Sequence, residues 1–141
     1  TTKKLWATVQ ERDGLGDDLV PDFFTEVKQG AFYGWPYAYI GPNEEPRRKG
    51  EAPELVKATV VADVILPAHV AAMDFAFYTG KQFPAKYRNG AFIAWRGSGN
   101  RSTRVGYSVV FLPFKNGKPA GAPEPFLSGW MTDPAQREVW G

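Results

Sequence analysis

Glycine and proline interrupt this chain more strongly than any other feature of its sequence. The 141 residues include 15 Gly and 12 Pro, and both residue types break or end helices. No long segment shows a clean helical repeat of apolar residues. The frequent breaks therefore predict about six or seven short strands joined by turns, in an all-β fold of antiparallel sheets.

The clearest strand is expected at 105–114, where large apolar side chains alternate between the two sides of an extended chain. Residues 41–54 combine three prolines with many charges, which predicts a surface loop. Further strands are expected at 5–10, 58–66, 71–78, 91–95 and 125–127, and 23–27 is expected as a strand or a single helical turn.

Charge and cysteine content exclude several classes of protein. The chain has 17 Lys and Arg against 15 Asp and Glu, so it lacks the strong positive charge of a nucleic-acid-binding domain. No apolar run approaches the roughly 18 residues of a membrane span, and the first residues do not resemble a signal peptide. The absence of Cys excludes disulfides and thiolate chemistry, and the single His69 excludes a His-rich zinc site.

An acidic loop at 11–18 is the first candidate site. It holds four carboxylates, and Gly14 and Gly16 allow backbone carbonyls to turn inward. Hard cations such as Ca²⁺ take carboxylate and carbonyl oxygens from irregular loops. The spacing is not that of an EF-hand loop, and a solvated acidic turn explains the same residues, so both interpretations stay open.

Three further features have a structural and a functional interpretation. The aromatic residues of 32–39 suit either core packing or a stacking wall for a ring-shaped ligand. His69 at a strand end is either structural or a titrating group. A glycine-rich loop presents Arg96, Asn100 and Arg101, which form either an exposed hairpin loop or a site for a carboxylate or phosphate.

The order of four motifs along the chain resembles the glucose/sorbosone dehydrogenase family. They lie at 6–17, 34–36, 76–84 and 97–102. This family comprises soluble-type sugar dehydrogenases that use pyrroloquinoline quinone (PQQ), and the sorbosone dehydrogenase-like branch is the most similar. The resemblance implies a six-bladed β-propeller, of which residues 1–141 form a partial domain of about two to three blades, truncated at both ends.

The resemblance also implies calcium sites. The acidic loop matches the family's loop whose backbone carbonyls help to hold the Ca²⁺ beside the cofactor, which places Asp13 and Gly14 nearest that ion. Asp18 and the carbonyl of Tyr33 match a second, structural Ca²⁺ site of some members, although the spacer between them is longer here.

For the quinone, the resemblance implies contacts from Arg96, Asn100 and Arg101, and it places His69 near the cofactor face. Many relatives carry His at the position of Arg96 and Trp at the position of Gly99. The family's general base lies upstream of the matched segment, so no catalytic residue is expected in this chain.

The expected function is therefore that of a segment of a PQQ-dependent sugar or aldehyde dehydrogenase. The full-length protein would transfer hydride from its substrate to PQQ and pass electrons to an acceptor, in the periplasm or outside the cell, while the isolated segment would be inactive. Open sheet edges predict homo-oligomers. The alternatives are a non-catalytic propeller module and a calcium-dependent propeller lactonase, and the arginines of 96–101 favour a polycarboxylate over a neutral lactone.

Overall fold

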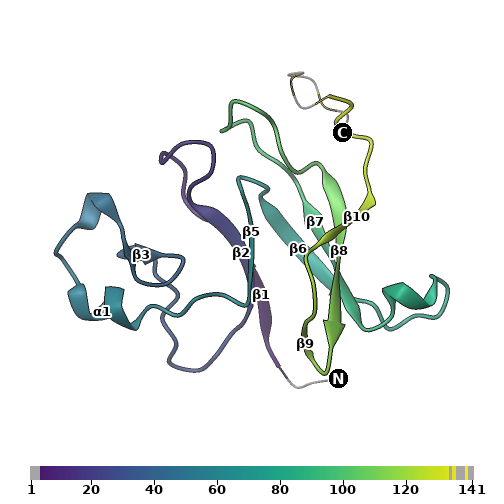
Figure 1. Cartoon of the computed structure of the whole chain (residues 1–141), viewed down its shortest axis with the longest axis horizontal. Coiled ribbons are helices and arrows are strands. Elements are labelled where there is room, and N and C mark those ends of the chain that lie inside the picture. The colour runs from purple at the N-terminus through teal and green to yellow at the C-terminus, as the bar shows by residue number, and fades with distance from the viewer. Residues whose placement is uncertain (1–3, 134, 136–138, 140–141) are drawn as a thin grey trace.

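Two antiparallel sheets form the body of the computed structural model, which describes residues 4–133, 135 and 139 (Figure 1). The first sheet has three strands in the order β1-β2-β5. These are β1 (Trp6–Val9), β2 (Pro21–Glu26) and β5 (Val64–Ala68), and both pairings are antiparallel.

The second sheet has five strands: four lie in the order β10-β8-β7-β6, and a short β9 pairs with the end of β8. Its strands are β6 (Ala72–Phe77), β7 (Gly90–Trp95), β8 (Ser108–Lys115), β9 (Lys118–Pro119) and β10 (Glu124–Leu127). The β7–β8 pairing is the longest regular one, from Gly90 opposite Pro113 to Trp95 opposite Ser108. The expected all-β, antiparallel class is confirmed.

The two sheets face one another across a core of large apolar side chains, here called the inter-sheet core. Trp6 of β1 stacks on Phe24 of β2 with ring centroids 5.0 Å apart, and Phe114 of β8 meets Trp6 edge-on at 5.1 Å. The buried members of this core are Trp6, Phe24, Leu66, Val70, Ala72, Ile93, Val110 and Leu112. Alternation along β7 and β8 sends every second residue into this core.

The remaining residues of β7 and β8 point to the opposite face of the second sheet, where they meet a separate aromatic group. Phe92 lies 4.5 Å from Phe126 and 5.3 Å from Phe111 between ring centroids. A 3₁₀ turn, η2 (Ala85–Tyr87), adds Tyr87 to the same group. The second sheet therefore carries apolar side chains on both faces.

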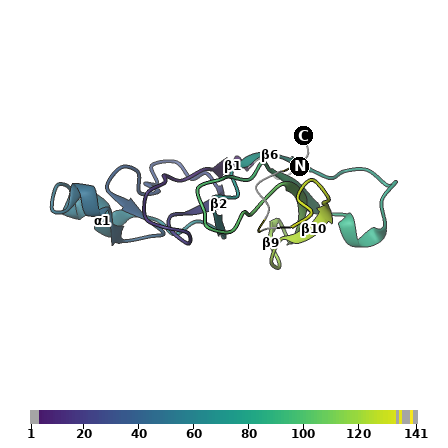
Figure 2. The ribbon, with the colours of Figure 1, turned by 90° about the horizontal axis from the view of Figure 1, so that it is seen from above.

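A long insertion joins β2 to β5 and lies at one end of the molecule, opposite η2 (Figure 2). It contains β3 (Ala38–Tyr39), β4 (Asn43–Glu44), the 3₁₀ turn η1 (Pro46–Arg48) and the helix α1 (Pro53–Ala58). The prediction of a strand from residue 58 is wrong at its start, since the chain is helical up to Ala58 and β5 begins at Val64.

The helix escaped prediction because it has only six residues, too few to show a helical repeat. Its start has a local cause, since Pro53 occupies a first-turn position where no backbone donor is needed. Glu54 in the same turn complements the helix dipole. Among the described residues, no helix has the length and apolar character needed to cross a membrane.

Candidate functional site

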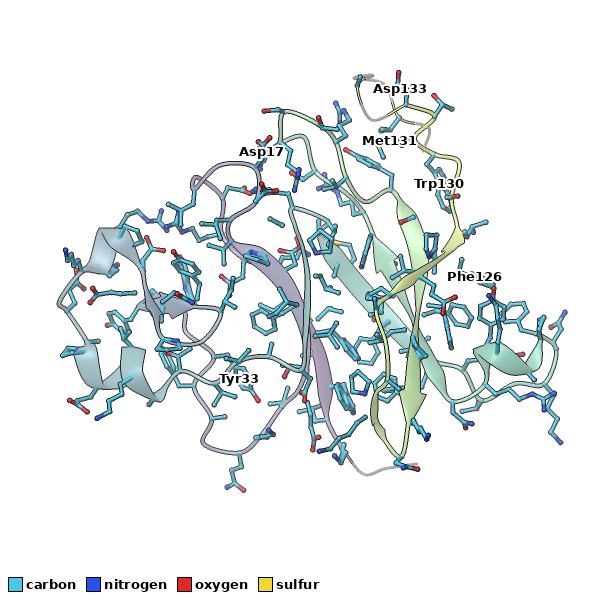
Figure 3. The ribbon with its side chains drawn as sticks, in the orientation of Figure 1. Asp17, Tyr33, Phe126, Trp130, Met131 and Asp133 are labelled. Atoms are coloured by element: carbon cyan, nitrogen blue, oxygen red, sulfur yellow. The ribbon has the colours of Figure 1, made fainter. Side chains whose placement is uncertain are left out.

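Three connections between strands meet at one end of the two sheets. They are the acidic loop (11–18) between β1 and β2, the connection 69–71 between β5 and β6, and the glycine loop (96–107) between β7 and β8. Figure 3 shows Asp17 at this end, and Tyr33 far from it near the lower edge of the first sheet. The residues predicted from the sequence to form the site therefore lie in two places, with Tyr33 apart from the others.

The acidic loop is anchored at its base by two buried carboxylates. Asp22 accepts hydrogen bonds from the backbone N–H of Glu11 at 2.9 Å and of Ala71 at 2.7 Å. Burial raises the pKa of Asp22, and these backbone donors oppose that rise. Glu45 accepts three hydrogen bonds from the Arg12 side chain, at 2.6, 2.6 and 2.8 Å. It also accepts two from Arg47, from Nε at 2.9 Å and from the backbone N–H at 3.2 Å.

These anchors lie in different electrostatic settings. Burial raises the pKa of Glu45, but the bonds from Arg12 and Arg47 outweigh it, and the pKa lies below its ordinary value. Glu11, half-buried beside Asp22, has its pKa raised chiefly by burial. The acidic loop therefore begins on a fixed base, while its outer carboxylates face other partners.

The connection 69–71 lies between the two loops and is bonded to both. His69 is 5% exposed, and its ring nitrogens lie 2.8 Å from Asp13 Oδ1 and 2.9 Å from the Gly16 carbonyl oxygen. On the other side, the backbone N–H of Arg96 donates to the Ala71 carbonyl at 3.1 Å, and that of Gly97 donates to the Val70 carbonyl at 2.7 Å. The three connections thus form one bonded unit.

The glycine loop closes at a narrow neck. Gly97 and Gly106 both have positive φ, +82° and +87°, and a Cβ on Gly106 would lie 2.6 Å from the Cα of Gly97. Only glycine lets the two backbones approach this closely. The loop beyond the neck reaches back to the acidic loop.

Beyond the neck, polar contacts join the two loops directly. Asn100 Nδ2 donates to Asp13 Oδ2 at 2.6 Å, and Arg101 Nη2 donates to Asp18 Oδ1 at 3.1 Å. The backbone N–H of Ser102 donates to Asp17 at 3.0 Å, and the bonds to Ser102 hold the pKa of Asp17 below its ordinary value. Asn100 and Arg101, which the resemblance assigns to the quinone, therefore have acidic partners within the chain.

An open cleft of about 600 Å³ lies beside the neck of the glycine loop. Arg96 lines it and forms no ion pair among the described residues, while Arg104 donates to the Tyr107 hydroxyl at 2.7 Å. Its lining residues are Met73, Ala94, Trp95, Arg96, Gly97, Ser98, Gly99, Arg104, Tyr107, Ser108, Val109, Trp130 and Val139.

One buried polar atom at this cleft lacks a partner. The indole Nε1 of Trp95 is buried and makes no hydrogen bond within the described part of the chain. Such a donor normally finds an acceptor when buried. The residue that carries this N–H group lines the cleft together with Arg96, while the N–H group itself is buried.

The cleft also contains residues that the sequence analysis missed. These are Trp95 of β7, Arg104 and Tyr107 of the glycine loop, and Trp130 of the C-terminal segment, and no motif spacing connects them. The carbonyl of Tyr33, in contrast, was assigned to the same calcium site as Asp18, but Figure 3 shows Tyr33 far from Asp17, the neighbour of Asp18. The Tyr33 hydroxyl donates to the Glu26 carbonyl at 2.7 Å. The structure does not bring Tyr33 and Asp18 together.

Comparisons with known proteins define the class to which this fold and site belong. Residues 54–128, more than half of the chain, match the TrAA12-like family. The chain belongs to this family. An uncharacterized protein of Borreliella burgdorferi is 39% identical over 104 residues, which are 72% of this chain and 27% of that protein.

Solved structures share the fold. An AA12 carbohydrate-active enzyme of Trichoderma reesei matches with a TM-score of 0.70 and 20% identity over 95% of this chain and 41% of its own. The PQQ domain of pyranose dehydrogenase from Coprinopsis cinerea matches with a TM-score of 0.63 and 18% identity over 94% and 39%. A glucose dehydrogenase matches with a TM-score of 0.59 and 24% identity over 89% and 32%.

These findings confirm the resemblance and the propeller-type fold. The chain is similar to PQQ-dependent oxidoreductase domains, and it spans about two fifths of the AA12 structure and about a quarter of the Borreliella burgdorferi relative.

Proposed function

We propose that this chain is part of a PQQ-dependent oxidoreductase and supplies contacts to the cofactor from the cleft beside the glycine loop. The observation that carries the proposal is the cleft that presents the guanidinium of Arg96, which forms no ion pair among the described residues. A guanidinium suits a ligand with several carboxylates, and PQQ is such a molecule.

The residues of the cleft would contribute to binding of the quinone in different ways. Arg96, free of ion pairs among the described residues, would bind a carboxylate of the quinone. Arg104 is held by Tyr107 at 2.7 Å and would add positive charge with less freedom of movement. Trp95 and Trp130 provide aromatic walls for a planar ring system. Bound PQQ would supply an acceptor for hydride from a sugar or aldehyde.

Calcium fits less completely than the quinone. Both carboxylate oxygens of Asp13 accept contacts from His69 and Asn100, and its carbonyl accepts a bond from Arg12 at 3.0 Å. Within the described residues, no cluster of three or more His, Asp or Glu side chains is suited to hold a metal. Asp13 and Gly14 remain the proposed nearest donors, and an ion there would need additional ligands or displacement of these contacts.

The activity of the longer protein is proposed on the same basis. Oxidation of a sugar or aldehyde would need a general base and a path to an electron acceptor that this chain is not expected to provide. The proposed role of the chain is therefore binding of the cofactor rather than catalysis by itself.

The proposal is tested by titrating the chain with PQQ, with CaCl₂ and with EDTA, while following its tryptophan fluorescence. We expect saturable quenching that Arg96→Ala weakens by about tenfold, because an ion pair in a partly enclosed site contributes about 1.4 kcal/mol or more. Arg88→Ala serves as the control, since Arg88 is exposed and does not line the cleft. Equal weakening by both variants, or no saturable quenching, would contradict the proposal.

A further inference from the structure

His69 connects the two loops of the candidate site without being available to a ligand itself. Its side chain is 3% exposed, and both ring nitrogens are in contact with acceptors of the acidic loop, Asp13 Oδ1 at 2.8 Å and the Gly16 carbonyl at 2.9 Å. A ring with both nitrogens occupied has no polar atom left for a cofactor. A direct contact with the quinone, as the resemblance implies for His69, would require these bonds to break.

The backbone at His69 explains how one side chain reaches the acidic loop. His69 and Ala71 both have positive φ, +68° and +51°, which is unusual for residues other than glycine and costs about 1 kcal/mol or more each. This sharp bend directs the imidazole to the acidic loop and the N–H of Ala71 to the buried carboxylate of Asp22. Strain of this kind persists only where the surrounding contacts hold it.

The same bend holds the glycine loop. The carbonyls of Val70 and Ala71 accept bonds from the N–H groups of Gly97 and Arg96, at 2.7 and 3.1 Å. Arg96 lines the cleft and forms no ion pair among the described residues. Its backbone is therefore bonded to a connection whose other side is fixed by His69 to Asp13 and Gly16.

We propose that His69 is a positioning residue, which sets the placement of the acidic loop relative to Arg96 through the connection 69–71. The part that concerns binding of a quinone rests on the function proposed above. The structural part stands on these hydrogen bonds alone. The ligand affected is a polycarboxylate bound by Arg96, and His69 acts on it through the backbone.

Amide hydrogen exchange of the chain tests the structural part with no ligand present. The reporters are backbone N–H groups that donate hydrogen bonds: Glu11 of the acidic loop to Asp22, and Arg96 and Gly97 of the glycine loop to Ala71 and Val70. His69→Ala should speed exchange at both Glu11 and 96–97 by about tenfold, since it removes the contacts that hold the acidic loop to the connection 69–71. Imidazole added at millimolar concentration should occupy the space left by the deleted side chain and restore slow exchange. Faster exchange confined to Glu11, or no change, would overturn the proposal.

A second variant separates the path through His69 from the direct contact that Asn100 makes with Asp13. Asn100→Ala removes the exposed bond to Asp13 and leaves the connection 69–71 intact. It also provides an answer if His69→Ala does not fold. We expect Asn100→Ala to leave the amides of Glu11, Arg96 and Gly97 protected, because His69 still holds the acidic loop to the connection 69–71. Loosening of these residues in Asn100→Ala would show that the direct contact carries the coupling and would overturn the proposal.

PQQ titration then tests the functional part. His69→Ala should weaken PQQ binding by about tenfold, and imidazole should restore it. Arg96→Ala should weaken binding while exchange at Glu11 and at position 96 stays slow, because the backbone bonds to Asp22 and Ala71 remain. If the unaltered chain shows no PQQ binding, the proposed function fails, and the exchange measurements still decide the role of His69.

Discussion

The inter-sheet core is held together by apolar contacts, whereas polar contacts hold together the three connections 11–18, 69–71 and 96–107, here called the loop unit. The core consists of stacked and edge-on rings such as Trp6 and Phe24, which are almost completely removed from water. The loop unit depends on hydrogen bonds to carboxylates, and the side chains of Asp13 and Asp18 are 57% and 88% exposed. Apolar burial contributes strongly to stability, whereas exposed ion pairs contribute about 1 kcal/mol or less.

This difference predicts that stability depends mainly on the core, whereas the proposed ligand contacts depend on the loops. Variants of the core should lower the free energy of unfolding, and variants of the loop tips should alter binding with little effect on stability. The buried anchors Asp22 and Glu45 lie at the border between the two regions. They allow the division to be tested one contact at a time.

The largest expected effect is in the core. Phe24→Ala should lower the free energy of unfolding by about 4 kcal/mol, because it removes a fully buried ring and leaves a cavity. Phe77→Ala is the matched control, since Phe77 belongs to the same ring cluster but is 42% exposed. Urea unfolding of both variants measures the difference, and equal losses would remove the distinction between core and periphery.

The next effect concerns two arginines that share one carboxylate. Arg12→Ala should cost about 3 kcal/mol, because the side chain of Arg12 is 10% exposed and its loss leaves Glu45 buried beside fewer donors. Arg47→Ala should cost less than about 1 kcal/mol, because that side chain is 58% exposed. If thermal unfolding shows the two variants to be equally stable, burial does not decide the strength of these ion pairs.

A smaller effect is expected from acid. The pKa of Glu45 is lower in the folded chain than its ordinary value of 4.5, so its pairing contributes stability above that pH which is lost as the pH falls through the folded pKa. Glu45→Gln should therefore be less stable than the unaltered chain at pH 7, with the difference shrinking towards pH 3. Melting temperatures across this range provide the measurement. A constant difference would mean that Glu45 does not titrate with folding.

The smallest effect is expected at the loop tips. Asp18→Asn should change the free energy of unfolding by less than about 0.5 kcal/mol, because its bond to Arg101 is exposed to solvent. A loss above about 1 kcal/mol in urea unfolding would show that the loop tips contribute to stability, and would contradict the separation between a stabilising core and a weakly stabilising loop unit.

Much of the local structure was predictable. Alternation of side chains identified the strands at 90–95 and 108–115 within a few residues, because alternation depends only on residues that are neighbours along the chain. The helix at 53–58 was missed because six residues are too few for a repeat. The acidic loop and the glycine loop were both recognised as candidate sites, because their composition is local as well.

The sequence by itself determined the class of the fold, the breaks between strands and the two loops that carry charge, since all of these depend on residues that are close along the chain. Only the tertiary structure decided which charged group meets which. His69 contacts Asp13 across 56 positions, and Asn100 contacts the same carboxylate across 87. The physical reason is the path of the antiparallel strands, which brings the three connections to the same end of the two sheets. Within the described part of the chain, Arg101 is thereby paired with Asp18, whereas Arg96 forms no ion pair.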